Sequence, residues 1–199
     1  MAPDTASTLN IANVVTVLRA LLVPVFAVLL LHDDGRDNEW RVAAWAVFVV
    51  ASVTDQIDGH LARSRGLVTK FGQVADPIAD KALTGAALIG LSSLGELPWW
   101  ITIAVLVREV GVTLLRFFVI RHGIIPASRG GKLKTLLQGL AIGLYVLPLT
   151  GLLASARAAV MTLAVVVTIA TGVDYVARAL TLRQTSDRAA MKRARRARR

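Results

Sequence analysis

The chain has 199 residues, of which 55% are hydrophobic and only 18% are charged. Soluble domains carry about 25% charged residues, so this composition argues against a soluble globular enzyme, a disordered chain or a coiled coil. The chain contains no cysteine, which excludes disulfides, thiolate catalysis and cysteine-ligated metals. The formal net charge is +10, and its distribution along the chain is more informative than its sum.

Six apolar runs are each long enough to cross a bilayer as a helix, which takes ~20 residues. They are Ile11–Leu31, Trp40–Ala62, Phe71–Leu94, Pro98–Ile120, Leu133–Leu153 and Ala156–Leu180. Helices are expected because a backbone in lipid must satisfy its own hydrogen bonds. We expect Pro148 to bend the fifth run. The sequence predicts an all-α, six-transmembrane-helix bundle in residues 1–182, followed by a basic tail in residues 183–199.

Basic residues near or beyond the ends of the runs gather on one side of the predicted membrane. The connections after the second and fourth runs, together with the segment from Arg178 onward, hold sixteen lysines and arginines. The opposite side holds only three, which are Arg36, Arg41 and Arg157. Because cytoplasmic loops carry the excess of positive charge, both termini are predicted to be cytoplasmic in a multi-pass cell-membrane protein.

Among the ionisable residues inside the predicted membrane spans, nine stand out, because each costs free energy there and suggests a function. They are Arg19, Asp55, Asp58, Asp76, Asp80, Lys81, Arg108, Glu109 and Arg116. Asp55 and Asp58 lie near the end of the second run, and Asp76 and Asp80 lie near the start of the third. The two residues of each pair are three or four positions apart, so they lie on one face of a helix. The four carboxylates are therefore expected to converge near the cytoplasmic surface.

Four carboxylates packed together in a low dielectric would repel one another unless cations lie between them. A donor set of oxygen atoms, without cysteine or a histidine pair, suits Mg²⁺ or Mn²⁺. The alternative is a set of interhelical salt bridges with Arg63, Lys81 and Arg108. A cation transporter or a purely structural membrane protein would also contain buried charges. A transporter, however, usually places its site at the midplane and often shows inverted repeats.

The stretch from Asp55 to Asp80 fits the pattern D-x2-D-G-x2-A-R-x8-G-x3-D-x3-D at all eight fixed positions. This pattern resembles the signature of the CDP-alcohol phosphotransferases. These are membrane enzymes with six helices that move a substituted phosphoryl group from a CDP-linked donor to an alcohol and release CMP. The resemblance implies an enzyme of that class that depends on a divalent metal, with two ions expected.

The resemblance also implies roles for the residues of the motif. Asp55, Asp58 and Asp76 would hold Mg²⁺ or Mn²⁺, and Asp80 would add a ligand or serve as the general base. The cytidine diphosphate would be cradled by four further positions, which are Gly59, Ala62, Arg63 and Gly72.

The pattern of Asn13, Thr16 and Arg19 is similar to the amino-terminal pattern of this family. Two further segments are similar to the branch of the family that uses glycerol 3-phosphate, and they read REVGVTLLRFFVIRHG and ASRGGKLKTLLQ. The implied substrates are CDP-diacylglycerol and glycerol 3-phosphate, and the family analogy implies a homodimer. Another phosphorylated acceptor, such as inositol phosphate, or phosphatidylglycerol as in a cardiolipin synthase, stays open.

A phosphorylated acceptor needs an anion site. Arg108 and Arg116 are eight residues apart and lie near one helix face, and arginine binds phosphate with two donors. Lys132 and Lys134 follow two glycines at an expected helix start. These four residues would bind the acceptor phosphate. Alternatively, the lysines only set topology, Arg108 pairs with Glu109 or Asp76, and Arg116 pairs with Glu109.

Overall fold

The computed structural model describes residues 11–64, 70–119 and 129–197, and within them the side chains of residues 15–54, 78–79, 81–115, 118 and 130–182. This part of the chain forms six α-helices and one short 3₁₀ helix, without a strand. They are α1 (Ile11–Leu31), η1 (His32–Gly35), α2 (Asn38–Ser64), α3 (Lys70–Ser93), α4 (Trp99–Val119), α5 (Arg129–Val146) and α6 (Leu152–Ala197). The predicted all-helical fold class is confirmed.

Local sequence explains where several helices begin. Asp37 caps α2, because its Oδ1 accepts hydrogen bonds from the backbone N–H groups of Glu39 at 2.9 Å and Trp40 at 3.4 Å. Pro98 directly precedes α4, and proline suits a helix start because it needs no N–H partner there. Gly35 ends η1 with a φ of 68°, and a Cβ there would lie only 2.7 Å from Leu94 Cδ1. Glycine thus permits a tight link between α1 and α2.

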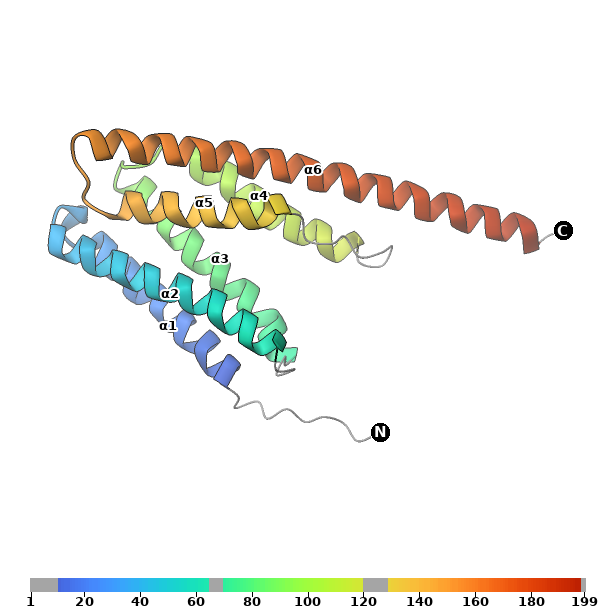
Figure 1. Cartoon of the computed structure of the whole chain (residues 1–199), viewed down its shortest axis with the longest axis horizontal. Coiled ribbons are helices and arrows are strands. Elements are labelled where there is room, and N and C mark those ends of the chain that lie inside the picture. The colour runs from blue at the N-terminus through green and yellow to red at the C-terminus, as the bar shows by residue number, and fades with distance from the viewer. Residues whose placement is uncertain (1–10, 65–69, 120–128, 198–199) are drawn as a thin grey trace.

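Successive helices run in opposite directions, as Figure 1 shows. Three connections lie at one end of the bundle: η1, residues 94–98 and residues 147–151. We call this the Glu96 end. The last turns of α2 and the first turns of α3 lie at the opposite end, which we call the motif end. In Figure 1, α6 extends beyond the other helices there.

The bundle packs around one apolar core. Helix α1 packs against α2 and α3, while α4 and α5 pack against α6, and α3 also contacts α4 and α5. A buried hydrogen bond of 2.6 Å between the hydroxyls of Ser92 and Thr102 joins α3 to α4. The largest fully buried apolar side chains come from four of the helices and one connection, and are Phe26, Leu30, Leu88, Leu91, Leu97, Ile142, Val146 and Met161.

The outer surface of the bundle is also apolar. Large hydrophobic side chains are more than 60% exposed on several helices, including Val28, Val107, Leu136 and Val173. Faces of this kind are unfavourable in water and favourable in lipid. Among the described residues, Val15–Gly35 and Leu152–Leu182 are long and apolar enough to cross a membrane. The structure therefore has the surface of a membrane protein.

The helix bounds follow the apolar runs closely in the first four helices and depart from them afterwards. Helix α1 coincides with the predicted run, and the bounds of α2, α3 and α4 differ by at most two residues. The prediction that Pro148 bends the fifth helix is wrong, because α5 already ends at Val146. Proline disfavours the helical conformation of the residue before it. Helix α6 continues to Ala197, well past the predicted Leu180.

Candidate active site

The motif residues lie on two neighbouring helices. Asp55 and Asp58 are on the last turns of α2, Asp76 and Asp80 are on the first turns of α3, and these two helices contact each other. The same turns carry the predicted nucleotide-binding residues, which are Gly59, Ala62, Arg63 and Gly72. The side chains of these residues lie outside the described set. The backbone thus brings both aspartate pairs to the motif end, and the metal site stays a prediction.

Arg108 projects from the middle of α4 toward α6. Its Nη2 donates a hydrogen bond of 3.1 Å to Oγ1 of Thr171 on α6, and its Nη1 donates one of 3.1 Å to Oε1 of Glu109. The side chain is only 16% exposed. The alternative that Arg108 pairs with Glu109 is therefore confirmed as a contact, which leaves the other donors of the guanidinium for a further partner.

Lys134 reaches the same carboxylate from α5. Its Nζ contacts Oε1 of Glu109, so one carboxylate oxygen carries both cations. We call the group of Arg108, Glu109, Lys134 and Thr171 the Glu109 cluster. Two of the four predicted acceptor residues thus meet across α4 and α5. Lys132 is exposed on the first turns of α5.

The fourth predicted acceptor residue, Arg116, lies two turns further along α4 than Arg108. Its side chain is outside the described set, so the choice between an acceptor role and a pair with Glu109 stays open. Glu109 already accepts from Arg108 and Lys134.

Around Arg108, three buried polar atoms of the described residues lie without a hydrogen-bond partner. They are Nε of Arg108, Oε1 of Gln138 and Oγ1 of Thr168. Gln138 is one helical turn from Lys134 on α5, and Thr168 is about one turn from Thr171 on α6. Buried polar groups are almost always hydrogen-bonded, so these atoms mark the surroundings of the Glu109 cluster as a place for a polar ligand or water.

Helix α6 makes room for Arg108 at a glycine. A Cβ on Gly172 would lie 3.0 Å from Cγ and 3.5 Å from Nε of Arg108. The contribution of α6 was not predicted from the sequence, because Thr168, Thr171 and Gly172 are common small residues within an apolar run. The sequence indicates Glu109 as a possible partner of Arg108, but the contact of Glu109 with Lys134 depends on how α4 and α5 meet in space.

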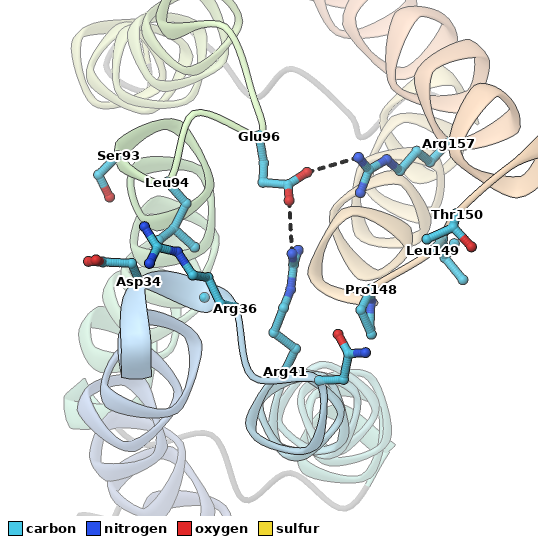
Figure 2. Close-up of a pocket in the computed structure, with 12 residues that line it drawn as sticks. Asp34, Arg36, Arg41, Ser93, Leu94, Glu96, Pro148, Leu149, Thr150 and Arg157 are labelled. Carbon is cyan, nitrogen blue, oxygen red and sulfur yellow. Dashed lines mark hydrogen bonds and ion pairs between the residues drawn. The ribbon is translucent and has the colours of Figure 1, made fainter.

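A second group of charged residues lies at the Glu96 end and borders a cavity of about 600 Å³. Figure 2 shows Glu96 between two arginines: its Oε1 accepts from Nη1 of Arg41 at 2.9 Å, and its Oε2 accepts from Nη2 of Arg157 at 2.8 Å. Arg41 also donates to the backbone carbonyls of Tyr145 and Val146. These bonds tie α2, the α3–α4 connection, α5 and α6 together.

The electrostatics of this group favour the ionised carboxylate. Burial raises the pKa of Glu96, but the hydrogen bonds and charges of Arg41 and Arg157 outweigh it, so the pKa lies below the ordinary 4.5. The cavity is thus remote from the motif end, and its carboxylate is already paired on both oxygens. We assign this group to holding the helices together.

Comparisons with known proteins agree with the motif. The family model described as CDP-alcohol phosphatidyltransferase matches residues 9–170. The chain is 58% identical over 171 residues to the "Probable phosphatidylglycerophosphate synthase" of Mycobacterium tuberculosis (strain H37Rv), which covers 86% of this chain and 82% of that protein. It is 39% identical over 148 residues to the "CDP-diacylglycerol--glycerol-3-phosphate 3-phosphatidyltransferase" of Bacillus subtilis, covering 69% of this chain and 77% of the relative. The chain therefore belongs to the CDP-alcohol phosphatidyltransferase family.

Proposed function

We propose that this chain transfers the phosphatidyl group from CDP-diacylglycerol to glycerol 3-phosphate, giving phosphatidylglycerophosphate and CMP. The observation that carries the proposal is the complete aspartate motif in a chain that is 58% identical to a protein named "Probable phosphatidylglycerophosphate synthase". The charged surroundings of α4 and α5 support a phosphorylated acceptor over a neutral one. This activity is a step in phospholipid biosynthesis.

We place the bundle in the cell membrane with six crossings, both termini in the cytoplasm and the motif end at the cytoplasmic surface. The sixteen basic residues on the motif side, against three on the Glu96 side, support this orientation. The alternating helix directions and the exposed apolar faces support the crossings. CDP-diacylglycerol has acyl chains that lie in the lipid and a charged nucleotide that lies in water. A site at the cytoplasmic surface of the membrane therefore suits both parts of this molecule.

The residues at the motif end fit a divalent metal. Both aspartate pairs lie on contacting helices at the same end of the bundle, and carboxylate oxygens are the donors that Mg²⁺ and Mn²⁺ prefer. Asp55, Asp58 and Asp76 would hold it, and Asp80 would add a ligand or serve as the general base. When bound, the metal supplies charge neutralisation for the pyrophosphate and for the departing CMP.

The chain's own residues then position the substrates and move one proton. Gly59 and Gly72 let the backbone come close to the nucleotide, and Arg63 supplies a donor for a phosphate. The hydroxyl oxygen of glycerol 3-phosphate bonds to the phosphorus that bears the diacylglycerol. The bond from that phosphorus to the bridging oxygen breaks, and CMP leaves. Asp80 accepts the hydroxyl proton as general base.

The acceptor phosphate would bind at the Glu109 cluster. Arg108 and Lys134 converge there, and the unpartnered Nε of Arg108 is a donor that a phosphate oxygen can satisfy. Lys132 and Arg116 lie on the same two helices, closer to the motif end, and would complete the positive surface.

Purified protein with CDP-diacylglycerol, Mg²⁺ or Mn²⁺ and a panel of acceptors tests the proposal. We expect CMP release with glycerol 3-phosphate and much slower release with inositol phosphate or phosphatidylglycerol. Preference for another acceptor would keep the family and overturn the substrate. A lack of CMP release with every acceptor would overturn the proposed reaction itself.

A further inference from the structure

We propose that Glu109 is a positioning residue for the acceptor phosphate, acting through the two cations that it holds. This inference rests on the proposed function. The carboxylate sets the separation and direction of Arg108 and Lys134, so that their charges face one anion. Glu109 itself does not touch the substrate.

Glu109 links α4 directly to α5, two helices that both pack against α6. These two helices are not among the closely packed helix pairs of the described bundle. The link from Glu109 on α4 to Lys134 on α5 therefore brings the lysine to the arginine. Both cations bind the same oxygen, Oε1, which holds the guanidinium and the ammonium side by side.

Arg108 is held at two points and retains free donors. Nη1 is held by Glu109 and Nη2 by Thr171, each at 3.1 Å. A guanidinium has five N–H donors in a rigid plane, so fixing two nitrogens fixes the direction of the whole fork. Nε of Arg108 is buried without a hydrogen-bond partner among the described residues. The held guanidinium thus points an unsatisfied donor into the protein.

Charge explains why a carboxylate is used. The side chains of Arg108, Lys134 and Glu109 are 16%, 7% and 16% exposed, so two cations share one anion in a buried place. Without the carboxylate the cations would repel in a low dielectric and move apart. With it the cluster keeps one positive charge in excess, which favours a phosphate monoester of charge about −2.

A structural ion pair would have the same contacts, so the test needs a matched control. Glu96 provides one, because it also bridges two cations from different helices and lies at the other end of the bundle. Loss of Glu96 should lower the melting temperature and leave the KM values unchanged. Loss of Glu109 should act on the acceptor in particular.

The experiment measures kcat and both KM values for wild type, Glu109→Gln and Glu96→Gln in detergent. We expect Glu109→Gln to raise the KM for glycerol 3-phosphate about tenfold, as for one lost charge-assisted hydrogen bond, with the KM for CDP-diacylglycerol within about twofold. Glu96→Gln should keep both KM values. An unchanged or lower KM for glycerol 3-phosphate in Glu109→Gln would overturn the inference, since Glu109 would then be structural or a competitor of the phosphate.

A double-mutant cycle tests whether Glu109 acts through Lys134. In a Lys134→Gln background, Glu109→Gln should raise the KM for glycerol 3-phosphate by no more than about threefold, because one of its two partners is gone. If Glu109→Gln raises the KM for glycerol 3-phosphate tenfold both with and without Lys134→Gln, Glu109 does not act through Lys134. Turnover of glycerol 3-phosphate by the wild type separates the proposed function from the role of Glu109. If the wild type does not turn over this acceptor, the proposed function is wrong. If it does, and the KM values of the Glu109 variants equal those of the wild type, only the role of Glu109 is wrong.

Discussion

Arg108 on α4 is joined to Thr171 on α6 by a hydrogen bond of 3.1 Å from Nη2 to Oγ1. The two residues are 63 positions apart, and the next residue on α6, Gly172, leaves the space through which the arginine side chain passes. Helix α6 therefore takes part in directing a cation that we assign to the acceptor site.

Gly172→Ala should displace Arg108, because the new Cβ would lie 3.0 Å from Cγ of Arg108. We expect the KM for glycerol 3-phosphate to rise by roughly threefold, in line with the loss of one ordinary hydrogen bond. Gly139→Ala is the control, since a Cβ there meets nothing within 4 Å. Equal KM values in wild type and Gly172→Ala would show that the position of Arg108 does not matter to the acceptor.

The stability of the bundle should depend on pH through Glu96. Its pKa is lower in the folded protein than the ordinary 4.5, so folding favours the ionised form. The stabilisation is therefore present above about pH 4.5 and is lost as the pH falls through the folded pKa. We expect the melting temperature in detergent to fall more steeply below pH 4.5 in wild type than in Glu96→Gln.

At pH 7, Glu96→Gln itself should melt about 3–6 °C lower than wild type. Asp174→Asn is the control, because its pair with Arg178 is exposed and worth little. Parallel pH curves for wild type and Glu96→Gln would refute the assignment of this group.

Removing residues 188–199 should leave turnover in detergent within about twofold of wild type, because no residue of the motif or of the Glu109 cluster lies beyond Thr171. This segment carries seven basic residues, and each contributes ~1 kcal/mol to attraction by an anionic surface. The truncated chain should therefore be inserted less efficiently into anionic membranes. A shortened protein that inserts normally but does not turn over would contradict this division of roles.

The motif aspartates should be required for activity and dispensable for folding. We expect Asp55→Asn, Asp58→Asn and Asp76→Asn each to lower kcat at least ~100-fold while the protein stays inserted. Without metal these variants should melt no lower than wild type, because a repelling charge is removed. Asp80→Asn should also lose activity. Wild-type turnover in any of the first three variants would refute the metal assignment.

The helices could be predicted from the sequence because each apolar run is bounded by polar residues or by Gly and Pro. Helix α1 has its predicted bounds for this reason. The apolar pattern cannot locate the end of α6, because the apolar run ends near Leu180 while the backbone stays helical to Ala197. No helix-breaking residue occurs in that extension. Pro148 does not bend the fifth helix as predicted, because α5 ends before it, at Val146.

The candidate site was predictable where its residues are close in sequence. The aspartates have helical spacing and belong to one motif, so their placement on α2 and α3 follows from the pattern. The link from Glu109 to Lys134 spans 25 positions, and that from Arg108 to Thr171 spans 63. Such contacts depend on which helices pack together and on the position along each helix at which they meet. A threonine in an apolar run gives no signal of its own.

Glycerol 3-phosphate carrying a radioactive label tests the central claim most directly. Purified protein is supplied with CDP-diacylglycerol and Mg²⁺ or Mn²⁺, and the label in the lipid fraction is measured together with CMP. The account predicts equal amounts of lipid-bound label and CMP in wild type, and neither product with Asp58→Asn or after chelation of the metal. CMP release without lipid-bound label, or labelled lipid formed equally well by Asp58→Asn, would contradict it.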